Sequence, residues 1–354
     1  MKILIGVCGI GNGHLNRQTN IIEYLLQSGH NVVVATTNNN IKFFQKKFPS
    51  LNIINIHIPW ITCNTNGINF KDSLKKYVDT KVDYYKMFFE FAIDVEKSFN
   101  SIPDIVITDY EPNVAQYSYA VNIPLICMEQ QSKFLFLKEE QIDNFSIIEE
   151  KRRINYFFPK YDKKIISSFF PIKSKDKKIK IVAPIIKKMN IITNKKNHVL
   201  VYFSPYSDSI KYKLILDTIS KMSNLNFIVY SNQDFEQYNN KNIVFKSFGD
   251  SFQSDLENAL FLITTAGHQL LSEAISINIP LYLIPLDTYE QNYNALMIEK
   301  YNLGKLSKKI NKRELSFFYN NLKYYSDNIK KFKSKYYKQS WENILGEILK
   351  NYEK

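Results

Sequence analysis

Residues 261–304 read FLITTAGHQLLSEAISINIPLYLIPLDTYEQNYNALMIEKYNLG, and this stretch decides the fold. The apolar run 261–264 predicts a buried strand, and the chain then turns at Gly267 into a segment with helical spacing of apolar residues over 268–277. The order repeats at once, with an apolar run at 280–284 and a helical pattern behind it. Strands that alternate with helices predict a parallel sheet that is covered on both faces.

The same alternation continues outward along the chain. Further strands are expected at 2–7, 31–36, 51–58, 104–108, 124–128, 198–203, 225–231 and 242–246, and further helices at 15–27, 41–48, 73–99, 113–121, 210–222, 252–260 and 289–301. Residues 141–180 predict a helix followed by short strands, and the tail from 315 is predicted to be helical throughout. The lysine-rich segment 186–197 is the expected hinge between an N-terminal domain, 1–190, and a C-terminal domain, 191–330. Two doubly wound domains that face each other place a ligand cleft between the carboxyl ends of both sheets.

Composition narrows the class of protein. The 354 residues include 47 Lys and Arg against 34 Asp and Glu, a net charge of +13. This surplus favours an anionic partner, namely a phosphorylated ligand, an acidic membrane surface or nucleic acid, although a solvated lysine-rich surface explains it equally well. Cys8, Cys63 and Cys127 show neither disulfide nor metal-site spacing, which indicates a reducing compartment. No apolar run is long enough to span a bilayer, so we expect a cytoplasmic protein that meets a membrane only from the side.

The segment GIGNGHLNR (9–17) follows the first expected strand and contains a glycine-rich turn. Its glycines, Gly9, Gly11 and Gly13, are spaced G-x-G-x-G, and His14 stands where a dinucleotide-binding fingerprint has its third glycine. The second expected strand ends without the carboxylate that holds a ribose in such proteins. Both departures count against a nicotinamide cofactor. The loop still suits an anion or a sugar, because a helix begins near His14 and points its free N–H groups into the cleft.

Two polar side chains follow this loop. His14 lies in the first helical turn, where it can act as a base or donate a hydrogen bond to a substrate; the alternative is a histidine that only packs at a helix start. Arg17, one turn further on, can pair with a phosphate or form a structural salt bridge.

The second glycine turn offers a more complete set of ligand groups. The helix that begins after Gly267 points its N-terminus at the cleft, which suits a diphosphate. Gln269 and Glu273 share a helix face, so Glu273 can accept hydrogen bonds from both hydroxyls of a ribose, or can be an exposed helix residue. Glu290 and Gln291 begin the next helix, and a carboxylate beside an amide supplies the acceptors and donors that sugar hydroxyls need.

These features together resemble a known family. The glycine turn with its helix, the strand NIPLYLIP (278–285) and the segment EQNYNA (290–295) resemble the donor-binding region of GT-B glycosyltransferases, most closely the MurG-like group. The loop GIGNGHLNR resembles the first loop of that group, and ITDYEP (107–112) and SFFPIKSKDKKIKIVAPII (168–186) are similar to a bacterial and archaeal branch of it. The resemblance covers nearly the whole chain in order. It implies the GT-B fold, in which a C-terminal helix, here 331–354, crosses back to the N-terminal domain.

The resemblance also implies roles for individual residues. The implied donor site consists of Gly267 and His268 at the diphosphate, Glu273 at the ribose, Glu290 and Gln291 at the transferred sugar, Phe248 or Phe252 at the nucleobase, and Ser204 on the donor-side wall. The implied acceptor side consists of Asp109, Glu111 and His14, beside the glycine loop. This chain departs from the group at His268, because members commonly have an apolar or small residue after the turn glycine.

The resemblance implies a reaction that moves a hexose-type sugar from a nucleotide-diphosphate donor to a hydroxyl acceptor, with UDP as the nucleotide expected from the family. The acceptor is expected to be a glycan or a lipid-linked molecule of cell-surface polysaccharide synthesis. His14, Glu111 or Asp109 would remove the hydroxyl proton, and the helix dipole, His268 and a cation would stabilise the leaving diphosphate. No Asp-x-Asp pair lies in a suitable loop, which fits a metal-independent transferase without a cofactor.

Three alternatives stay open. A nucleotide-sugar hydrolase or epimerase of the same fold would use the same donor residues, and a phage-type glycosyltransferase that modifies nucleic acid would suit the positive charge. A binding protein without turnover is the third, although the donor residues are retained. The aromatic, basic segments 84–91 and 157–170 are either core helices or a surface that rests on an anionic membrane beside a lipid-linked acceptor.

Overall fold

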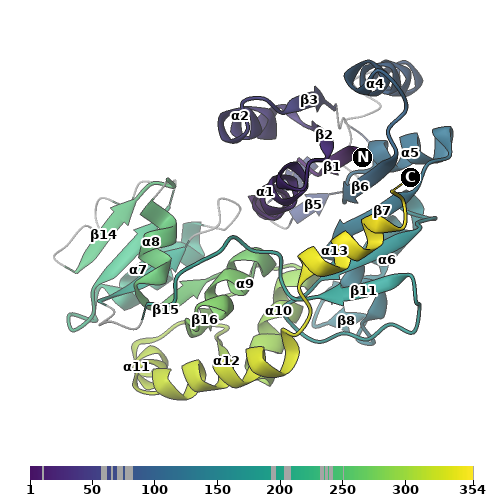
Figure 1. Cartoon of the computed structure of the whole chain (residues 1–354). Helices are drawn as coiled ribbons and strands as arrows, with labels where there is room; N and C mark the ends of the chain where they lie inside the picture. Colours follow the sequence, from purple (N-terminus) through teal and green to yellow (C-terminus); the bar gives the residue numbers. More distant parts are fainter. Residues whose placement is uncertain are drawn as a thin grey trace.

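The computed structural model describes residues 1–9, 12–56, 62–64, 67–69, 75, 83–192, 197–202, 209–231, 235, 238, 242–249 and 251–353. The larger described strands form two parallel sheets, one from each half of the chain (Figure 1). The N-terminal sheet has the order β11 (Ile179–Val182), β10 (Lys163–Ser167), β7 (Leu125–Glu129), β6 (Ile105–Asp109), β1 (Lys2–Val7), β2 (Asn31–Thr36), β3 (Asn52–Asn55). The C-terminal sheet has the order β14 (Ile243–Lys246), β13 (Phe227–Tyr230), β12 (His198–Tyr202), β15 (Ala259–Thr264), β16 (Leu281–Leu283), β17 (Gly304–Leu306). The prediction of an α/β fold with two Rossmann-like sheets is confirmed.

Helices connect these parallel strands and continue the chain beyond the last of them. They are α1 (Asn12–Gln27), α2 (Asn38–Lys47), α4 (Tyr84–Phe99), α5 (Pro112–Val121), the 3-10 helix η1 (Gln131–Phe136), α6 (Ile148–Phe157), α7 (Ser209–Ile219), α8 (Ser251–Glu257), α9 (His268–Ser276), α10 (Tyr289–Lys300), α11 (Lys312–Asn320), α12 (Leu322–Tyr336) and α13 (Trp341–Lys350). Two antiparallel hairpins pair β4 (Thr62–Asn64) with β5 (Gly67–Asn69) and β8 (Gln141–Ile142) with β9 (Phe145–Ser146). Within the described ranges, no helix has the length and apolar content needed to cross a bilayer.

Capping residues set the ends of several helices. Asp83 accepts a hydrogen bond from the backbone N–H of Lys86 and so starts α4, and Asn100 ends this helix in the left-handed conformation. Thr288 caps α10 in the same way as Asp83 caps α4. Short polar side chains at these positions satisfy N–H groups that have no partner inside the helix. The helix ends therefore follow from local sequence.

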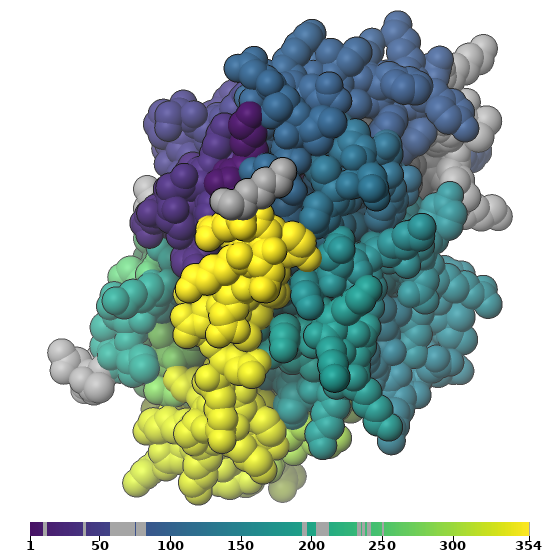
Figure 2. Space-filling model, turned by 45° about the vertical axis from the view of Figure 1, so that its right-hand side comes forward, coloured from purple at the N-terminus to yellow at the C-terminus, as the bar shows by residue number. Residues whose placement is uncertain are grey.

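Alternate residues of β1 pack on opposite faces of the N-terminal sheet. Ile3 and Ile5 belong to a core cluster with residues of α1 and α13, whereas Leu4 belongs to the cluster that contains α5. Helix α13 therefore packs on the N-terminal sheet although it ends the chain; Figure 2 shows this yellow segment against residues of the N-terminal half. Trp341 of α13 meets Tyr24 of α1 edge-on, with 5.4 Å between ring centres.

Each sheet has one point at which its strand order reverses. In the N-terminal sheet β2 lies on one side of β1 and β6 on the other, and in the C-terminal sheet β13 and β15 flank β12 in the same way. Ligands of such sheets bind outside the carboxyl ends of the strands at the reversal point. In the N-terminal sheet, the start of α1 and the end of β6 lie at this point. In the C-terminal sheet, the turn between β15 and α9 lies there.

The structure differs from the sequence predictions in a few segments. The helix η1 and strand β17 were not predicted, and the tail is broken by Asn321 and residues 337–340 into separate helices because Asn321 ends α11. Of the expected helix 73–99, most of the first third lies outside the described residues, and the rest is α4. The aromatic segment 157–170 is core, because its phenylalanines are buried.

Candidate active site

His14 and Asp109 meet at the reversal point of the N-terminal sheet. β1 pairs with β6 in parallel, with Val7 opposite Asp109, so the start of α1 and the end of β6 lie at the same edge. His14 Nδ1 lies 3.0 Å from Asp109 Oδ1, and both side chains are buried. The ring of Tyr110 stacks beside His14, with 6.5 Å between ring centres. The fold thus brings together two of the three residues predicted as bases.

The carboxylate of Asp109 is held by two more side chains of α1. Arg17 donates to both of its oxygens, at 2.7 and 2.9 Å from Nη2 and 3.2 Å from Nε, and Gln18 Nε2 donates at 3.1 Å. Burial opposes ionisation, but the charge of Arg17 and the hydrogen bonds from His14 and Arg17 outweigh it and lower the pKa of Asp109 below its ordinary value. Asp109 is therefore ionised near neutral pH. Of the two alternatives for Arg17, the structure favours the salt bridge over a phosphate contact.

The 3-10 helix η1 brings an amide to the other nitrogen of His14. η1 follows β7, the neighbour of β6, and Glu129 fixes its start by accepting hydrogen bonds from the Ser132 N–H at 2.9 and 3.2 Å. Gln131 Nε2 lies 3.1 Å from His14 Nε2. Arg17 Nη2 also lies 3.1 Å from His14 Nδ1, but the Asp109 carboxylate at 3.0 Å can only accept. We therefore assign the tautomer in which Nδ1–H donates to Asp109 and Nε2 accepts from Gln131. Nε2 is then the basic nitrogen of His14. Gln131 was not among the predicted site residues.

The glycine turn of the C-terminal half faces η1. Gly267 is the N-cap of α9, and a Cβ atom there would meet no atom within 4 Å, so the space beside its Cα is open. His268 is buried, with its ring 5.0 Å from that of Phe169 and its Nδ1 3.0 Å from Lys133 Nζ. Burial and the charges of Lys133 and Arg17 lower the pKa of His268 well below its ordinary value, so its ring is neutral. A neutral His268 contributes a hydrogen bond rather than a charge.

Glu290 and Gln291 begin α10 beside this turn. Glu290 Oε1 lies 3.4 Å from Lys133 Nζ, so the carboxylate faces the N-terminal half of the chain. Gln291 Oε1 accepts hydrogen bonds from the backbone N–H groups of Ala266 and Leu286 at 2.9 and 3.0 Å. The carbonyl of Gln291 therefore braces the glycine turn. Only the amide nitrogen of Gln291 is then available for the predicted contact with the sugar.

Glu273 lies on the second turn of α9, next to the connection between the two sheets. Gln269 Nε2 donates to Glu273 Oε1 at 3.1 Å and to the carbonyl of Ile185 at 3.3 Å. Burial raises the pKa of Glu273 to about 7, although the hydrogen bond from Gln269 and the charge of Lys187 oppose the rise. The alternative of an exposed helix glutamate is wrong, because the side chain is half-buried.

Phe248 and Phe252 belong to an aromatic cluster at the carboxyl edge of the C-terminal sheet. Tyr202 ends β12 and Tyr230 ends β13, and ring centres within the cluster are 4.9–5.9 Å apart. Phe248 is exposed and so offers an aromatic face on which a flat ring can stack. The predicted donor-wall residue Ser204 lies outside the described residues.

A family comparison decides the class of protein. The model of Glycosyl transferase family 1 matches residues 1–323 of this chain. The chain belongs to this family. It is a glycosyltransferase, as the sequence predicted, and residues 1–323 include both glycine turns, His14, Asp109, Glu273 and Glu290.

Individual relatives agree with the family and the fold. An uncharacterised glycosyltransferase of Methanosarcina mazei is 23% identical over 331 residues, which are 86% of this chain and 85% of that protein. Arabidopsis thaliana UGT89C1 with quercetin has a TM-score of 0.72 at 12% identity, over 99% of this chain and 100% of its own. The calicheamicin glycosyltransferase CalG4 has a TM-score of 0.69 at 12% identity, over 99% of this chain and 98% of its own. The predicted GT-B fold is confirmed.

Glu111 of the glycosyltransferase caps a helix. Tyr110 has a left-handed φ of 55° and turns the chain between Asp109 and Glu111. Glu111 is fully buried; one carboxylate oxygen accepts from the Val114 N–H and the other from Asn113 Nδ2, both at 2.8 Å. Both oxygens are therefore used to start α5. The structure corrects the prediction that Glu111 serves as a base.

This cap makes the stability of the transferase depend on pH. Loss of hydration raises the pKa of Glu111 from 4.5 to about 7 against the opposing hydrogen bonds from Val114 and Asn113, so stability falls as pH rises through this window. Glu111→Gln should remove this penalty. The unfolding free energy of the variant relative to the unchanged protein should rise by about 2.5 kcal/mol between pH 5 and pH 8. Urea titrations at both pH values measure it; a constant difference would contradict the raised pKa.

The first glycine loop of the transferase packs tightly. A Cβ atom at Gly9 would lie 2.1 Å from Thr37 Oγ1, so this glycine is required by packing against the end of β2 rather than by a ligand. A Cβ atom at Gly13 would lie 3.6 Å from Gln269 Cβ, so the start of α1 adjoins α9. Gly11 lies outside the described residues.

Buried polar atoms without partners gather between α1, η1 and α9. Among the described residues, these atoms include Arg17 Nη1, Gln18 Oε1, Gln130 Oε1, Gln131 Oε1, Ser132 Oγ and His268 Nε2. Buried polar atoms in folded proteins nearly always have hydrogen-bond partners, so such a cluster indicates a binding site for a polar ligand. No group of metal-binding side chains occurs in the part of the chain that the structure describes.

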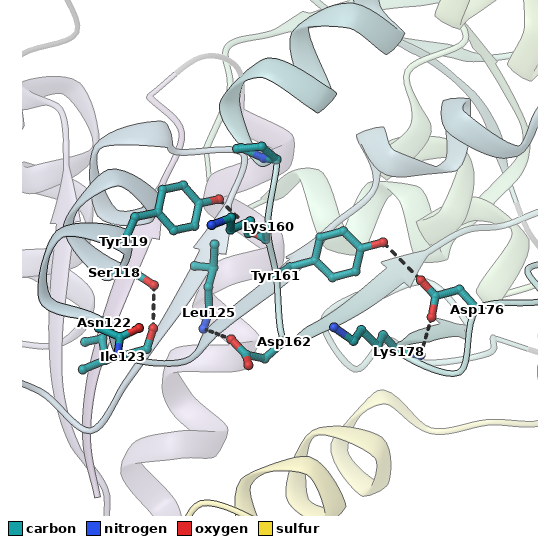
Figure 3. Close-up of a pocket in the computed structure, with 11 residues that line it drawn as sticks. Ser118, Tyr119, Asn122, Ile123, Leu125, Lys160, Tyr161, Asp162, Asp176 and Lys178 are labelled. Atoms are coloured by element: carbon teal, nitrogen blue, oxygen red, sulfur yellow. Dashed lines mark hydrogen bonds between the residues drawn. The ribbon is translucent and has the colours of Figure 1, made fainter.

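A separate hollow of about 620 Å³ lies at the opposite edge of the N-terminal sheet, beside the amino ends of β7, β10 and β11 (Figure 3). Its polar groups bond to one another: Tyr161 Oη donates to Asp176 at 3.3 Å, and the Leu125 N–H donates to Asp162 at 2.9 Å. It contains none of the predicted site residues. The candidate active site is therefore the region around His14 and Gly267, where α1, η1 and α9 meet.

Proposed function

We propose that this glycosyltransferase moves a sugar from a nucleotide diphosphate to a hydroxyl acceptor, with His14 as the general base. The observation that supports this role is the contact of His14 Nδ1 with the buried, ionised Asp109 at 3.0 Å. A carboxylate in this position orients the imidazole and stabilises the imidazolium that forms when Nε2 takes up a proton.

In the proposed reaction the acceptor hydroxyl takes the place of the Gln131 amide at His14 Nε2. Its oxygen bonds to the anomeric carbon of the donor sugar, and its proton passes to Nε2. The bond between that carbon and the diphosphate breaks, and both electrons leave with the diphosphate. The N-terminus of α9 stabilises the added negative charge, so we assign this task to protein groups rather than to a metal ion or a further cofactor.

The proposed donor is a UDP-sugar of the hexose type. UDP and UDP-L-rhamnose are bound in structures of two of the fold relatives, an anthocyanidin 3-O-glucosyltransferase and UGT89C1. In this chain the exposed ring of Phe248 suits a nucleobase and Glu273 a ribose. Glu290 and the amide nitrogen of Gln291 suit the sugar hydroxyls.

We propose a glycan or a lipid-linked molecule as the acceptor, in polysaccharide synthesis at the cytoplasmic face of an anionic membrane. Helix α4 supports a peripheral contact of this kind, because Tyr85, Phe89 and Ile93 are exposed and follow one another at intervals of four residues. Apolar side chains on one face of a helix can enter the head-group region of a bilayer.

Nucleotide sugars should stabilise the protein, and this tests the donor assignment. A ligand at one hundred times its dissociation constant adds about 2.7 kcal/mol to the unfolding free energy, which raises the melting temperature by several degrees. We expect this shift with a UDP-sugar in a panel that also contains GDP-, ADP- and dTDP-sugars. Glu273→Ala should reduce it. If no member of the panel raises the melting temperature, the donor proposal fails; if free sugar forms without an acceptor, the protein is a hydrolase.

A further inference from the structure

Lys133 is a buried lysine that joins the two halves of the chain. It belongs to η1 in the N-terminal half and is 0% exposed. Its ammonium lies 3.0 Å from His268 Nδ1 and 3.4 Å from Glu290 Oε1, and both partners belong to the C-terminal half. A lysine is almost never fully buried unless it is paired, so this position calls for a functional explanation.

The protein partners of Lys133 only partly satisfy its charge. An ammonium carries three hydrogens, and of the two polar partners His268 is neutral and Glu290 is at the long distance of 3.4 Å with its side chain 33% exposed. The rings of Phe134 and Phe170 have their centres 4.9 and 5.8 Å from Nζ. Burial lowers the pKa of Lys133 and so does the charge of Arg17, whereas Glu290 and Glu129 raise it. Lys133 therefore has the capacity to bind an additional anion.

Lys133 also determines which nitrogen of His268 carries the proton. Because the ammonium donates to Nδ1, the neutral ring carries its hydrogen on Nε2. This Nε2 is buried and has no partner among the described residues. It lies on the first residue of α9, next to Gly267 with its open Cα side. A buried N–H donor, the first N–H groups of a helix and an ammonium thus lie around His268, and each of them suits a phosphate oxygen.

We propose that Lys133 is a catalytic residue that neutralises the diphosphate as its bond to the sugar breaks. The inference rests on the proposed function, in which His268 adjoins the diphosphate and Glu290 adjoins the sugar. Lys133 Nζ contacts both of these residues, so it lies at the junction of diphosphate and sugar, where the breaking bond is. The electrons of that bond add one negative charge to the diphosphate, and the ammonium of Lys133 offsets this charge.

The position of Lys133 on η1 couples this step to His14. Gln131, two residues earlier on the same helix, contacts His14 Nε2 at 3.1 Å. One short element of the N-terminal half therefore serves the base and the leaving group together. Because the donor residues belong to the other half, the ammonium acts only when the two halves are in contact.

Lys133→Met tests the proposal, because methionine keeps the length and apolar stem of lysine and removes the charge. We expect kcat to fall about 10²- to 10³-fold, while the donor KM changes less than about tenfold. Binding is measured by calorimetry with two probes. One is the nucleoside diphosphate, among UDP, GDP, ADP and dTDP, that the unchanged protein binds most tightly, and the other is the corresponding monophosphate. Lys133→Met should weaken the diphosphate at least about tenfold and leave the monophosphate nearly unchanged. Lys133→Arg should recover part of kcat.

Lys164 provides the matched control. Like Lys133, it is a buried lysine of the N-terminal half of the chain. It lies on β10 and its side chain is 1% exposed. Its ammonium is 4.3 Å from the ring centre of Tyr161, at the opposite edge of the sheet. Lys164→Met should keep kcat within about threefold of the unchanged protein. If Lys133→Met does not fold, Lys133→Ala is assayed with and without methylammonium, and recovery of kcat with the amine supports the proposal.

The outcomes separate the inference from the proposed function. If the unchanged protein binds no nucleoside diphosphate and transfers no sugar, the proposed function fails and the role of Lys133 fails with it. If the unchanged protein does both and Lys133→Met retains its kcat and diphosphate affinity, only the role of Lys133 is overturned. Equal loss of diphosphate and monophosphate binding, or no rescue of Lys133→Ala by the amine, also overturns it.

Discussion

His14→Ala is expected to lower kcat by about 10³- to 10⁴-fold, the upper part of the range for a general base. The acceptor hydroxyl keeps its proton in the variant, and the carboxylate of Asp109, fixed by Arg17 and Gln18, cannot move to replace the imidazole. Release of nucleoside diphosphate in the presence of donor and acceptor measures the effect. Donor binding should be retained, because the donor residues belong to the other half of the chain.

His30 offers a control for this variant. It lies in the same half of the chain, outside the cleft, with its Nδ1 3.4 Å from the amino terminus. His30→Ala should keep kcat within about twofold. Calorimetry with the donor separates the remaining outcomes: if His14→Ala loses donor affinity together with kcat, His14 is a donor contact, and if kcat is unchanged, another group is the base.

The fold could be predicted because most strands of these sheets have their own apolar run and several helices begin at a capping residue. The reversal points then follow from chain order, so the neighbourhood of His14 and Gly267 could be expected before any contact was seen. The pairing of His14 with Asp109 follows from the register of β1 with β6, in which Val7 lies opposite Asp109. The strand order of a parallel sheet therefore determines which residues meet in part of its active site.

Gln131 and Lys133 could not be found in this way. They follow β7 in the polar segment EQQSK, and a lysine there is typical of a solvated loop. Their positions depend on a short 3-10 helix that Glu129 starts and on the contact of Lys133 with α9 and α10 of the C-terminal half. Contacts between distant segments leave no periodic pattern in the sequence. Only the adjacency of β7 and β6 could have indicated that this segment ends near His14.

The error for Glu111 is of the opposite kind. Glu111 was predicted to be a site residue because it is close to Asp109 in the sequence. Only Tyr110 separates it from Asp109 along the chain, yet the left-handed φ of Tyr110 redirects the backbone at this point. The carboxylate then faces the first N–H groups of α5, where Pro112 begins the helix. A capping role was open to sequence reasoning, because an acidic residue directly before a proline is typical of a helix start.

Asp109→Ala is expected to lower the free energy of unfolding by about 3–5 kcal/mol, because it leaves Arg17 buried without its counter-charge. Arg17 is 1% exposed, so water cannot replace the carboxylate. Acid should have the same effect on the unchanged protein. The folded pKa of Asp109 is below its ordinary value, so its contribution is present above about pH 4 and is lost as pH falls through the lowered pKa. Urea titration of both proteins at pH 7 measures the difference.

The double variant Asp109→Ala, Arg17→Met separates charge from packing. If the buried charge of Arg17 causes the instability, removing it should restore much of the lost free energy, because a missing pair costs less than a single unpaired ion. Asp327→Ala is the control, since Asp327 pairs with Lys330 at 3.2 Å on the exposed surface and should cost less than about 1 kcal/mol. Equal instability of the single and double variants would assign the loss to the cavity. The double variant should still be inactive, because stability depends on the balance with Arg17 whereas kcat depends on the contact of Asp109 with His14.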